Sequence, residues 1–365
     1  MSFQMLEGVD VFDVSWFSLV GGSSSPETGI QIDYTMARHY TAQSTFRFTD
    51  MTASKDANLS NIVLSNGEIN EDDPSESTYK EYTLTPTFDK DTTSYEIELL
   101  DYIDDMDLTA TQSDENATMK VKVPKRDDDD KLVYEDDETT IVYEEKTLTD
   151  GVPLNVIINK LGEPDTVLTI TVTAEDAKTT KEYTVTIKRP FATIKGSIYT
   201  APTAALERYT SNIKLYNSSD VATVVNWSNL SNEEERANLH SNMTSLDSID
   251  FVTNDDGTYE IYVIPRQYDI VLDKGGYLDH IYKERTLEEG DVLDLGLYEL
   301  LGGDVDKDGL IDLTDSSLIN SQYLLDQTSS DFDTYVHYDF NEDLIIDLTD
   351  LSILNSNYLC ELEVE

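Results

Sequence analysis

The sequence lacks the features that would cross-link the chain or carry it into a membrane. Cys360 is the single cysteine, so no internal disulfide can form. No apolar run reaches about 18 residues, so we expect no membrane insertion. Residues 1–20 have no basic segment ahead of an apolar one, so no signal peptide is visible. The abrupt start is consistent with the C-terminal piece of a longer protein.

Basic residues are also scarce. The chain has 25 Lys and Arg against 74 Asp and Glu, which gives a net charge of −49. Such a surface repels DNA, RNA and anionic lipid and attracts multivalent cations, so we expect no nucleic-acid partner. The 22 tyrosines argue against a disordered acidic tail. Together with many Thr and Val, they favour half-buried β-strands.

Motifs of catalysis are missing as well. The chain has no His-Glu-x-x-His and no Gly-x-Ser-x-Gly motif. Its four histidines are spread over the chain and are expected at surfaces or turns: His39, His240, His280 and His337. A carboxylate pair for glycoside hydrolysis could come from any of the 74 acidic residues, so the sequence leaves enzyme activity undecided. We expect no catalytic domain within this chain.

Most of the chain before residue 300 has the alternating apolar and polar residues of β-strands. Residues 1–57 contain two strand-like pieces of unknown role. Residues 58–190 and 191–300 each carry several strands with short turns, which predicts two mainly antiparallel β-sandwiches. The acidic run 126–139 could hold a cation, but a solvated loop is the favoured interpretation because like charges in a row repel. A polar insertion near residues 228–245 predicts a short helix without chemistry.

The stretch "DVDKDGLIDLTD" (304–315) has the spacing of a twelve-residue calcium loop, with glycine at position 6 for the sharp turn. Ile311 at position 8 is apolar, as expected for a residue that packs inward, and position 12 is Asp in place of the usual Glu. The oxygen ligands would come from Asp304, Asp306, Asp308, the Leu310 carbonyl, Asp312 and Asp315.

The stretch "DFNEDLIIDLTD" (339–350) repeats this spacing. The corresponding ligands would be Asp339, Asn341, Asp343, the Ile345 carbonyl, Asp347 and Asp350. Position 6 is Leu344, and a left-handed turn costs such a residue about 1–2 kcal/mol. This second stretch, loop 2, also has one carboxylate fewer than the first stretch, loop 1, so we predict that loop 1 binds calcium more tightly. Acidic turns without a metal are the alternative, but converging carboxylates would repel. Mg²⁺ is not the expected ion, because it seldom binds at a site made of protein ligands alone.

Each loop is followed by an amphipathic segment, "SSLINSQYLL" and then "LSILNSNYLC", which predicts a helix each time. Two loop–helix units in residues 301–365 resemble the type I dockerin domain of cellulosome proteins. The resemblance implies a small all-α domain with paired calcium loop–helix (F-hand) motifs, two Ca²⁺ ions, and a cohesin module of a scaffoldin as partner.

The resemblance also implies a recognition pair at positions 10 and 11 of each loop, which here are Leu313-Thr314 and Leu348-Thr349. An apolar residue beside a hydroxyl suits the centre of an interface. Packing of both leucines inside the domain is the alternative, but Ile311 and Ile346 already have the inward role. Because both pairs are Leu-Thr, either helix could bind after half a turn of the domain.

The regions ahead of the loops carry two further resemblances. "LTPTFDKDTTSYEIEL" (84–99) and "LTITVTAEDAKTTKEYTVTIKRP" (168–190) are similar to cadherin-like β-sandwiches of bacterial extracellular proteins. "DDGTYEIYVIPRQYDIVLDKGGYL" (255–278) resembles carboxypeptidase-regulatory-like, transthyretin-like sandwiches. The resemblance to such modules implies that these regions act as spacers.

The expected organisation is therefore a β segment (1–57), two sandwiches (58–190 and 191–300) and a dockerin (301–365). We expect a secreted, calcium-dependent assembly protein of polysaccharide-degrading complexes, located outside the cell or at its surface. The alternatives are the C-terminal fragment of a dockerin-bearing polysaccharide-degrading enzyme, or a carbohydrate-binding module with a polysaccharide partner. Trp16 and Trp227, the only tryptophans, are too far apart in sequence to suggest an aromatic binding line.

Overall fold

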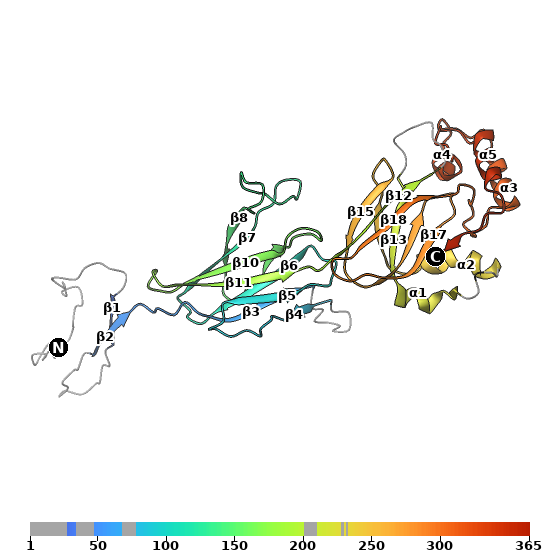
Figure 1. Cartoon of the computed structure of the whole chain (residues 1–365). Coiled ribbons are helices and arrows are strands. Elements are labelled where there is room, and N and C mark those ends of the chain that lie inside the picture. The colour runs from blue at the N-terminus through green and yellow to red at the C-terminus, as the bar shows by residue number, and fades with distance from the viewer. Residues whose placement is uncertain (1–27, 34–46, 68–77, 201–209, 228–229, 231–232) are drawn as a thin grey trace, which may run out of the picture. The chain divides into compact units, whose positions relative to one another are not determined.

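The structure is a computed structural model that describes residues 28–33, 47–67, 78–200, 210–227, 230 and 233–365. Trp16, His39 and much of the predicted segment 1–57 lie outside these residues. The chain forms two compact units (Figure 1). Unit 1 is Met1–Leu99 with Ile103–Lys188, and unit 2 is Leu100–Tyr102 with Arg189–Glu365. Both are built mainly from β-sheets, in agreement with the predicted multidomain β architecture.

Unit 1 contains an antiparallel pair and a two-sheet sandwich. The pair is β1 (Thr28–Asp33) with β2 (Arg47–Thr52). One sheet has the order β5-β11-β10-β7-β8, with β5 (Ser94–Glu98), β7 (Thr118–Pro124), β8 (Tyr143–Leu148), β10 (Thr166–Thr173) and β11 (Thr180–Lys188). The other has the order β4-β3-β6-β9, with β3 (Leu59–Asn66), β4 (Lys80–Tyr82), β6 (Asp105–Gln112) and β9 (Leu154–Ile157).

The unit 1 core follows from the period-two pattern of its strands. In β10, Leu168, Ile170 and Val172 are fully buried while the residues between them are partly exposed. They join one hydrophobic cluster with buried residues of the opposite sheet, such as Leu64 and Leu108. All pairings are antiparallel except β5 with β11, which is parallel.

The acidic run 126–139 extends the β7–β8 connection as two tight turns, held by bridges from Arg126 to Leu132 and from Tyr134 to Ile141. The Arg126 guanidinium lies 2.6 Å from Glu163 and also donates to the Asp130 carbonyl. The arrangement is that of a hydrogen-bonded surface loop.

Unit 2 has two sheets and a group of helices. The sheets have the orders β15-β12-β18 and β14-β13-β16-β17-β19. Their strands are β12 (Ala192–Tyr199), β13 (Asn212–Asn217), β14 (Ser248–Val252), β15 (Thr258–Val263), β16 (Gln267–Asp273), β17 (His280–Thr286), β18 (Val292–Glu299) and β19 (Glu363–Val364). The helices are α1 (Ser218–Val224), α2 (Glu233–Thr244), α3 (Leu313–Ser321), α4 (Phe332–Tyr335), the 3₁₀ turn η4 (Val336–Tyr338) and α5 (Leu348–Ser356).

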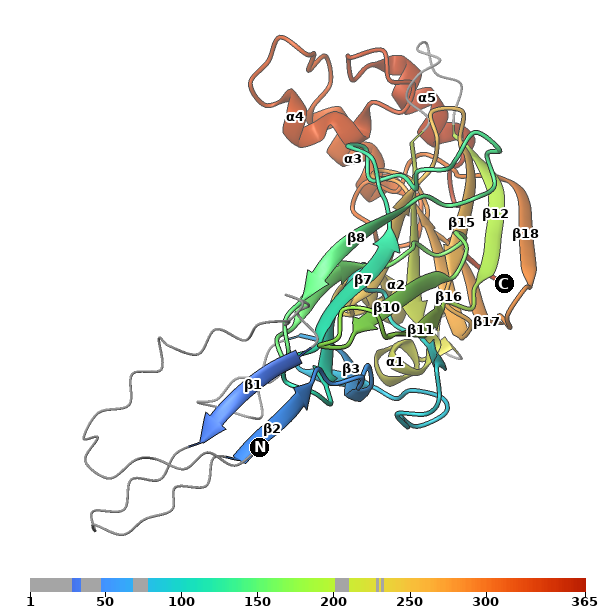
Figure 2. The ribbon, with the colours of Figure 1, turned by 90° about the vertical axis from the view of Figure 1, so that its left-hand side faces the viewer.

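Helices α3, α4 and α5 lie together at one end of the unit 2 sheets in both views (Figure 1 and Figure 2). From there the chain returns to the five-stranded sheet, where β19 pairs in parallel with β17. The sequence places a domain boundary at residue 300, whereas the structure describes residues 189–365 as one unit. Ile311, Ile346 and Leu354 share a hydrophobic cluster with Ile270 and Leu272 of β16.

The contact between sheet and helical segment depends on the turn after β16. Gly276 has φ +79°, and a Cβ at this position would lie 2.0 Å from the His337 carbonyl oxygen. The Tyr277 hydroxyl donates to the Phe340 carbonyl at 2.9 Å, and the two rings are 5.7 Å apart, edge to face. Only glycine allows this approach, so Gly276 and Tyr277 together hold the helical segment against the turn after β16.

Candidate metal-binding loops

Three of the five carboxylates of loop 1 lie close together, and those of Asp308 and Asp312 are not part of this group. Side-chain oxygens of Asp304, Asp306 and Asp315 lie within 4.8 Å of one another. Asp304 is 1% exposed and Asp315 is fully buried, whereas Asp306 is open to solvent. Among the described residues, this is the one group of three such side chains close enough to share a metal ion.

Backbone amides shape loop 1 around these carboxylates. The N–H groups of Asp308 and Gly309 donate to Asp304 at 3.2 Å each. Gly309 has φ +80°, the left-handed conformation that the sixth position of a calcium loop requires. Its place is also tight, because a Cβ there would lie 2.4 Å from a methyl group of Leu362.

Loop 2 repeats this geometry. The N–H groups of Asp343 and Leu344 donate to Asp339 at 3.1 and 2.8 Å. Leu344 has φ +74° in the place of Gly309, so the strained turn is present despite its side chain. Asn341 is 8% exposed, and its amide donates to Asp343 at 2.9 Å.

The ninth and twelfth residues of each loop also begin a helix. Asp312 caps α3 by accepting from the Thr314 N–H at 2.6 Å, and the Asp312 N–H donates back to Asp315 at 2.8 Å. Asp347 and Asp350 form the same capping box at α5. Negative charge at a helix N-terminus is stabilising, so these carboxylates suit both the loop and the helix.

Each loop is closed by the segment that follows the helix of the other half. Ile311 exchanges backbone hydrogen bonds with the 359–360 segment beyond α5, and Ile346 does so with residues 324–325 beyond α3. Ile311 and Ile346 are both fully buried, as expected for the inward position 8. The two halves therefore form one interlocked pair.

The buried carboxyl groups of the two loops have pKa values above the usual one for aspartate. Burial raises the pKa of Asp304 to about 8, although the charge of Lys307 acts in the opposite direction. Burial likewise raises the pKa of Asp315 and of Asp339 to about 6. The pKa of Asp350 is raised for the same reason. Carboxylates buried side by side with raised pKa values indicate a site that binds protons or cations.

The donor set fits a calcium ion. It is made of oxygen atoms alone, and Ca²⁺ takes about six to eight oxygen ligands from carboxylates, amides and carbonyls. The absence of nitrogen and sulfur donors disfavours zinc and copper.

The predicted recognition pairs lie on the surface at the starts of α3 and α5. Leu313 and Leu348 are each 68% exposed, and Thr314 and Thr349 are exposed too. The exposure is also similar just beyond the ends of the two helices, where Leu324 and Leu359 are 61% and 65% exposed. Equal exposure at equivalent positions shows that the unit 2 sheets leave both helix starts equally open.

The sequence did not predict the residues that tie the loops to the sheets. Lys307 at position 4 of loop 1 contacts Asp273 and Asp279, and Glu342 at position 4 of loop 2 contacts Lys274. Position 4 is not a ligand position, and nothing in the local pattern says what its side chain meets. The one available signal is that the two otherwise matched loops have opposite charges there.

Comparison with known proteins identifies one part of the chain. Residues 59–190 match the family model of the cadherin-like beta sandwich domain. Unit 1 therefore contains a cadherin-like β-sandwich, which confirms that prediction. No curated protein matches the chain.

Three solved structures show limited similarity. Two are interface mutants, one N-terminal and one C-terminal, of a type II cohesin–X–dockerin complex from Acetivibrio cellulolyticus; they are 20% and 17% identical, each covers 47% of this chain and 97% of its own, and both have a TM-score of 0.32. The third is the Bacillus anthracis TIE protein, 10% identical, covering 60% of this chain and 40% of its own, with a TM-score of 0.20. Similarity at this level carries no functional argument.

Proposed function

We propose that residues 301–365 are a type I dockerin, which binds two calcium ions and attaches the chain to a cohesin module of a scaffoldin. The main support is the convergence of the buried carboxylates Asp304 and Asp315 with Asp306. Loop 2, Asp339–Asp350, repeats the backbone conformation and the amide hydrogen bonds of this loop. Burying a carboxylate costs free energy unless its charge is compensated. Burial of these side chains therefore favours a cation site over a plain acidic turn.

The ions would be held by the oxygen atoms that the spacing predicts. Bound calcium supplies positive charge that offsets the repulsion among the carboxylates. In loop 1 the ligands are Asp304, Asp306, Asp308, the Leu310 carbonyl, Asp312 and Asp315. In loop 2 they are Asp339, Asn341, Asp343, the Ile345 carbonyl, Asp347 and Asp350.

The partner surface would be the exposed starts of α3 and α5. A leucine that is 68% exposed beside a threonine hydroxyl offers an apolar anchor and a hydrogen bond. The duplicated pair favours an assembly module over a calcium buffer, which needs no such surface. We further propose that the protein acts outside the cell or at its surface, with the β-sandwiches as spacers. A dockerin-bearing enzyme fragment remains the alternative, with the same role for residues 301–365.

The test combines calcium titration with cohesin binding. Calorimetry of the full chain should show two calcium ions bound, and Asp304→Asn with Asp339→Asn should remove both. A panel of immobilised cohesin modules should capture the wild-type chain in calcium but not in EDTA. Asp255→Asn, an exposed turn residue of the same unit, serves as the matched control and should behave as wild type. Absence of calcium binding, or capture that survives EDTA, contradicts the proposal.

A further inference from the structure

The fourth residue of each loop points to a connection between the loops and the sheet. Lys307 and Glu342 occupy this position, and both have left-handed backbone conformations, with φ +59° and +53°. Their side chains are only 17% and 14% exposed. A calcium loop takes no ligand from position 4, so burial of a charged side chain there needs another explanation.

Lys307 is bound by the turn between β16 and β17. Its ammonium lies 2.9 Å from an Asp273 oxygen and 2.6 Å from an Asp279 oxygen. It also donates to the carbonyls of Lys274 and Tyr277, at 3.0 and 2.7 Å. Four oxygen partners compensate a buried ammonium well, whereas removing the ammonium would leave two carboxylates without it.

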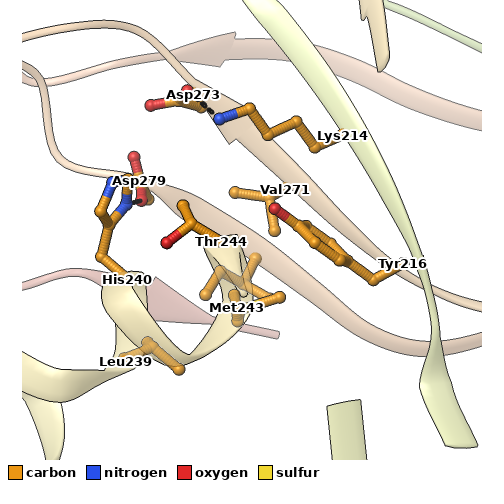
Figure 3. Close-up of a pocket in the computed structure, with 10 residues that line it drawn as sticks. Lys214, Tyr216, Leu239, His240, Met243, Thr244, Val271, Asp273 and Asp279 are labelled. Atoms are coloured by element: carbon orange, nitrogen blue, oxygen red, sulfur yellow. Dashed lines mark hydrogen bonds and ion pairs between the residues drawn. The ribbon is translucent and has the colours of Figure 1, made fainter. Parts of the chain in front are cut away.

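The same two carboxylates extend the network into the sheet and helix α2. Asp273 is 2.8 Å from the Lys214 ammonium, and Asp279 is 3.2 Å from His240 Nδ1 (Figure 3). Lys214 lies on β13 and His240 on α2. Loop 1 is therefore linked through Lys307 to a strand and a helix that are distant from it in sequence.

Loop 2 has the opposite charge in the same place. The Glu342 carboxylate accepts from the Lys274 ammonium at 2.7 Å, and Lys274 is 15% exposed. The turn after β16 thus presents carboxylates to the lysine of loop 1 and a lysine to the carboxylate of loop 2. Exchanging the two matched halves by half a turn would bring Lys307 to Lys274 and Glu342 to Asp273, and like charges at such distances repel.

We propose that Lys307 and Glu342 are positioning residues that fix one of the two orientations in which the matched loops could pack on the unit 2 sheets, and that they couple cation binding in the loops to the stability of those sheets. This inference rests on the proposed calcium function. Its consequence is that calcium protects the turn after β16 and strand β17, although neither supplies a ligand. If a partner can bind the chain in two orientations related by half a turn, the contact between the loops and the unit 2 sheets must be the same in both orientations.

The test is amide hydrogen exchange on the full chain, with and without saturating Ca²⁺. In the wild type, calcium should slow exchange in both loops and, by about tenfold, in residues 274–286; tenfold corresponds to about 1.4 kcal/mol of coupling. In Lys307→Met/Glu342→Gln the loops should still respond while residues 274–286 lose the effect. Strands β10 and β11 of unit 1 are the internal control. Lys195→Met, which removes a partly exposed lysine 3.6 Å from Asp294, should match the wild type.

A charge exchange distinguishes orientation from simple loss of packing. Glu342→Lys alone places two ammonium groups together and should remove the calcium effect on residues 274–286. Lys274→Glu/Glu342→Lys restores the pair with reversed sign and should recover most of it. Glu342→Gln alone gives a milder readout if the double variant does not fold.

Three results would overturn the inference. Protection of the loops without protection of residues 274–286 in the wild type leaves the calcium function standing and removes the coupling. A calcium effect on residues 274–286 that persists unchanged in Lys307→Met/Glu342→Gln removes the role of these two side chains. No calcium response in either loop removes both the inference and the proposed function.

Discussion

At the scale of single residues, Leu344 adopts a backbone conformation that favours glycine. It holds φ +74°, next to +80° for Gly309 in the matched loop. A left-handed turn costs a side-chain-bearing residue about 1–2 kcal/mol. Leu344 offsets part of this cost because its half-buried side chain packs against the unit 2 core. The strain is therefore retained in exchange for apolar contact.

Leu344→Gly should make loop 2 bind calcium more tightly, by up to about tenfold, since the loaded turn no longer strains a side chain. The same change should lower overall stability slightly, because apolar contact is lost and glycine loses more entropy on folding. Calorimetric titration separates the first effect from the second, which urea unfolding measures. In the wild type, equal affinities or a stronger loop 2 would contradict the ranking of the loops.

The raised carboxyl pKa values predict a dependence on pH. Asp304 has a pKa of about 8, and Asp315 and Asp339 have values of about 6. Calcium needs these groups ionised, so binding near pH 7 should release about one proton, and calcium affinity should fall as the pH drops from 8 to about 5.5. Titrations in two buffers of different ionisation enthalpy measure the protons released.

The sign for folding without calcium is the reverse of the usual one for aspartates. The folded pKa values lie above the ordinary value of 3.8, so these three carboxyl groups bind more protons in the folded chain than in the unfolded chain between about pH 4 and 8. Their contribution to stability in EDTA should therefore rise as the pH falls through this range, whereas burial lowers the pKa of His280 and His337, which opposes this rise. A calcium affinity that does not change with pH would show that the buried carboxyls are already ionised.

At the scale of elements, helices α3 and α5 are present where the amphipathic segments predict them, but each begins three residues earlier than its segment, at Leu313 and Leu348. The earlier start follows from Asp-Leu-Thr-Asp, which supplies an N-cap and a capping box each time. Strands with strict alternation, such as β10 and β15, were equally clear. Elements without a local signal were missed. Strand β19 has two residues and exists only because β17 offers it an edge.

The ion pairs of Lys307 and Glu342 were missed for a related reason. Their partners lie about 30 to 70 residues away in sequence, and a single sequence carries no information on such contacts. The loop spacing, by contrast, is a local pattern, and three of the five carboxylates that it selects in loop 1 lie together in the structure, those of Asp304, Asp306 and Asp315. Local periodicity and caps could be predicted, while long-range packing could not.

The equal exposure of the two helix starts predicts two interchangeable ways of binding a cohesin. Replacing Leu313 and Thr314 by Ala should weaken binding only about twofold, because one of two equivalent arrangements is lost. Replacing Leu348 and Thr349 as well should abolish it. Surface plasmon resonance with a matching cohesin measures both, and Leu297→Ala, 74% exposed on β18, is the matched control. Complete loss from the first pair alone would contradict equivalence of the helices.

At the scale of the whole molecule, the two units differ in what stabilises them. Unit 1 has a core formed by the two sheets of its own sandwich. Unit 2 has a core that includes Ile311, Ile319, Ile346 and Leu354 from the loop–helix segment. None of the helices in the described part of the chain has the length and apolar character needed to span a bilayer. A ligand of the loops should thus affect unit 2 and leave unit 1 unchanged.

Removal of calcium should accordingly lower the melting temperature of one unit only. A ligand at a hundred times its dissociation constant stabilises the folded state by about 2.7 kcal/mol per site, which corresponds to about 5–10 °C for a unit of this size. Scanning calorimetry of the full chain should show two transitions, of which EDTA lowers the one assigned to unit 2. Asp304→Asn/Asp339→Asn should place that transition at the EDTA position even in calcium, and Asp255→Asn should not. If both transitions move together, calcium acts on the net charge of −49 through general screening, and the loops are not the origin of the effect.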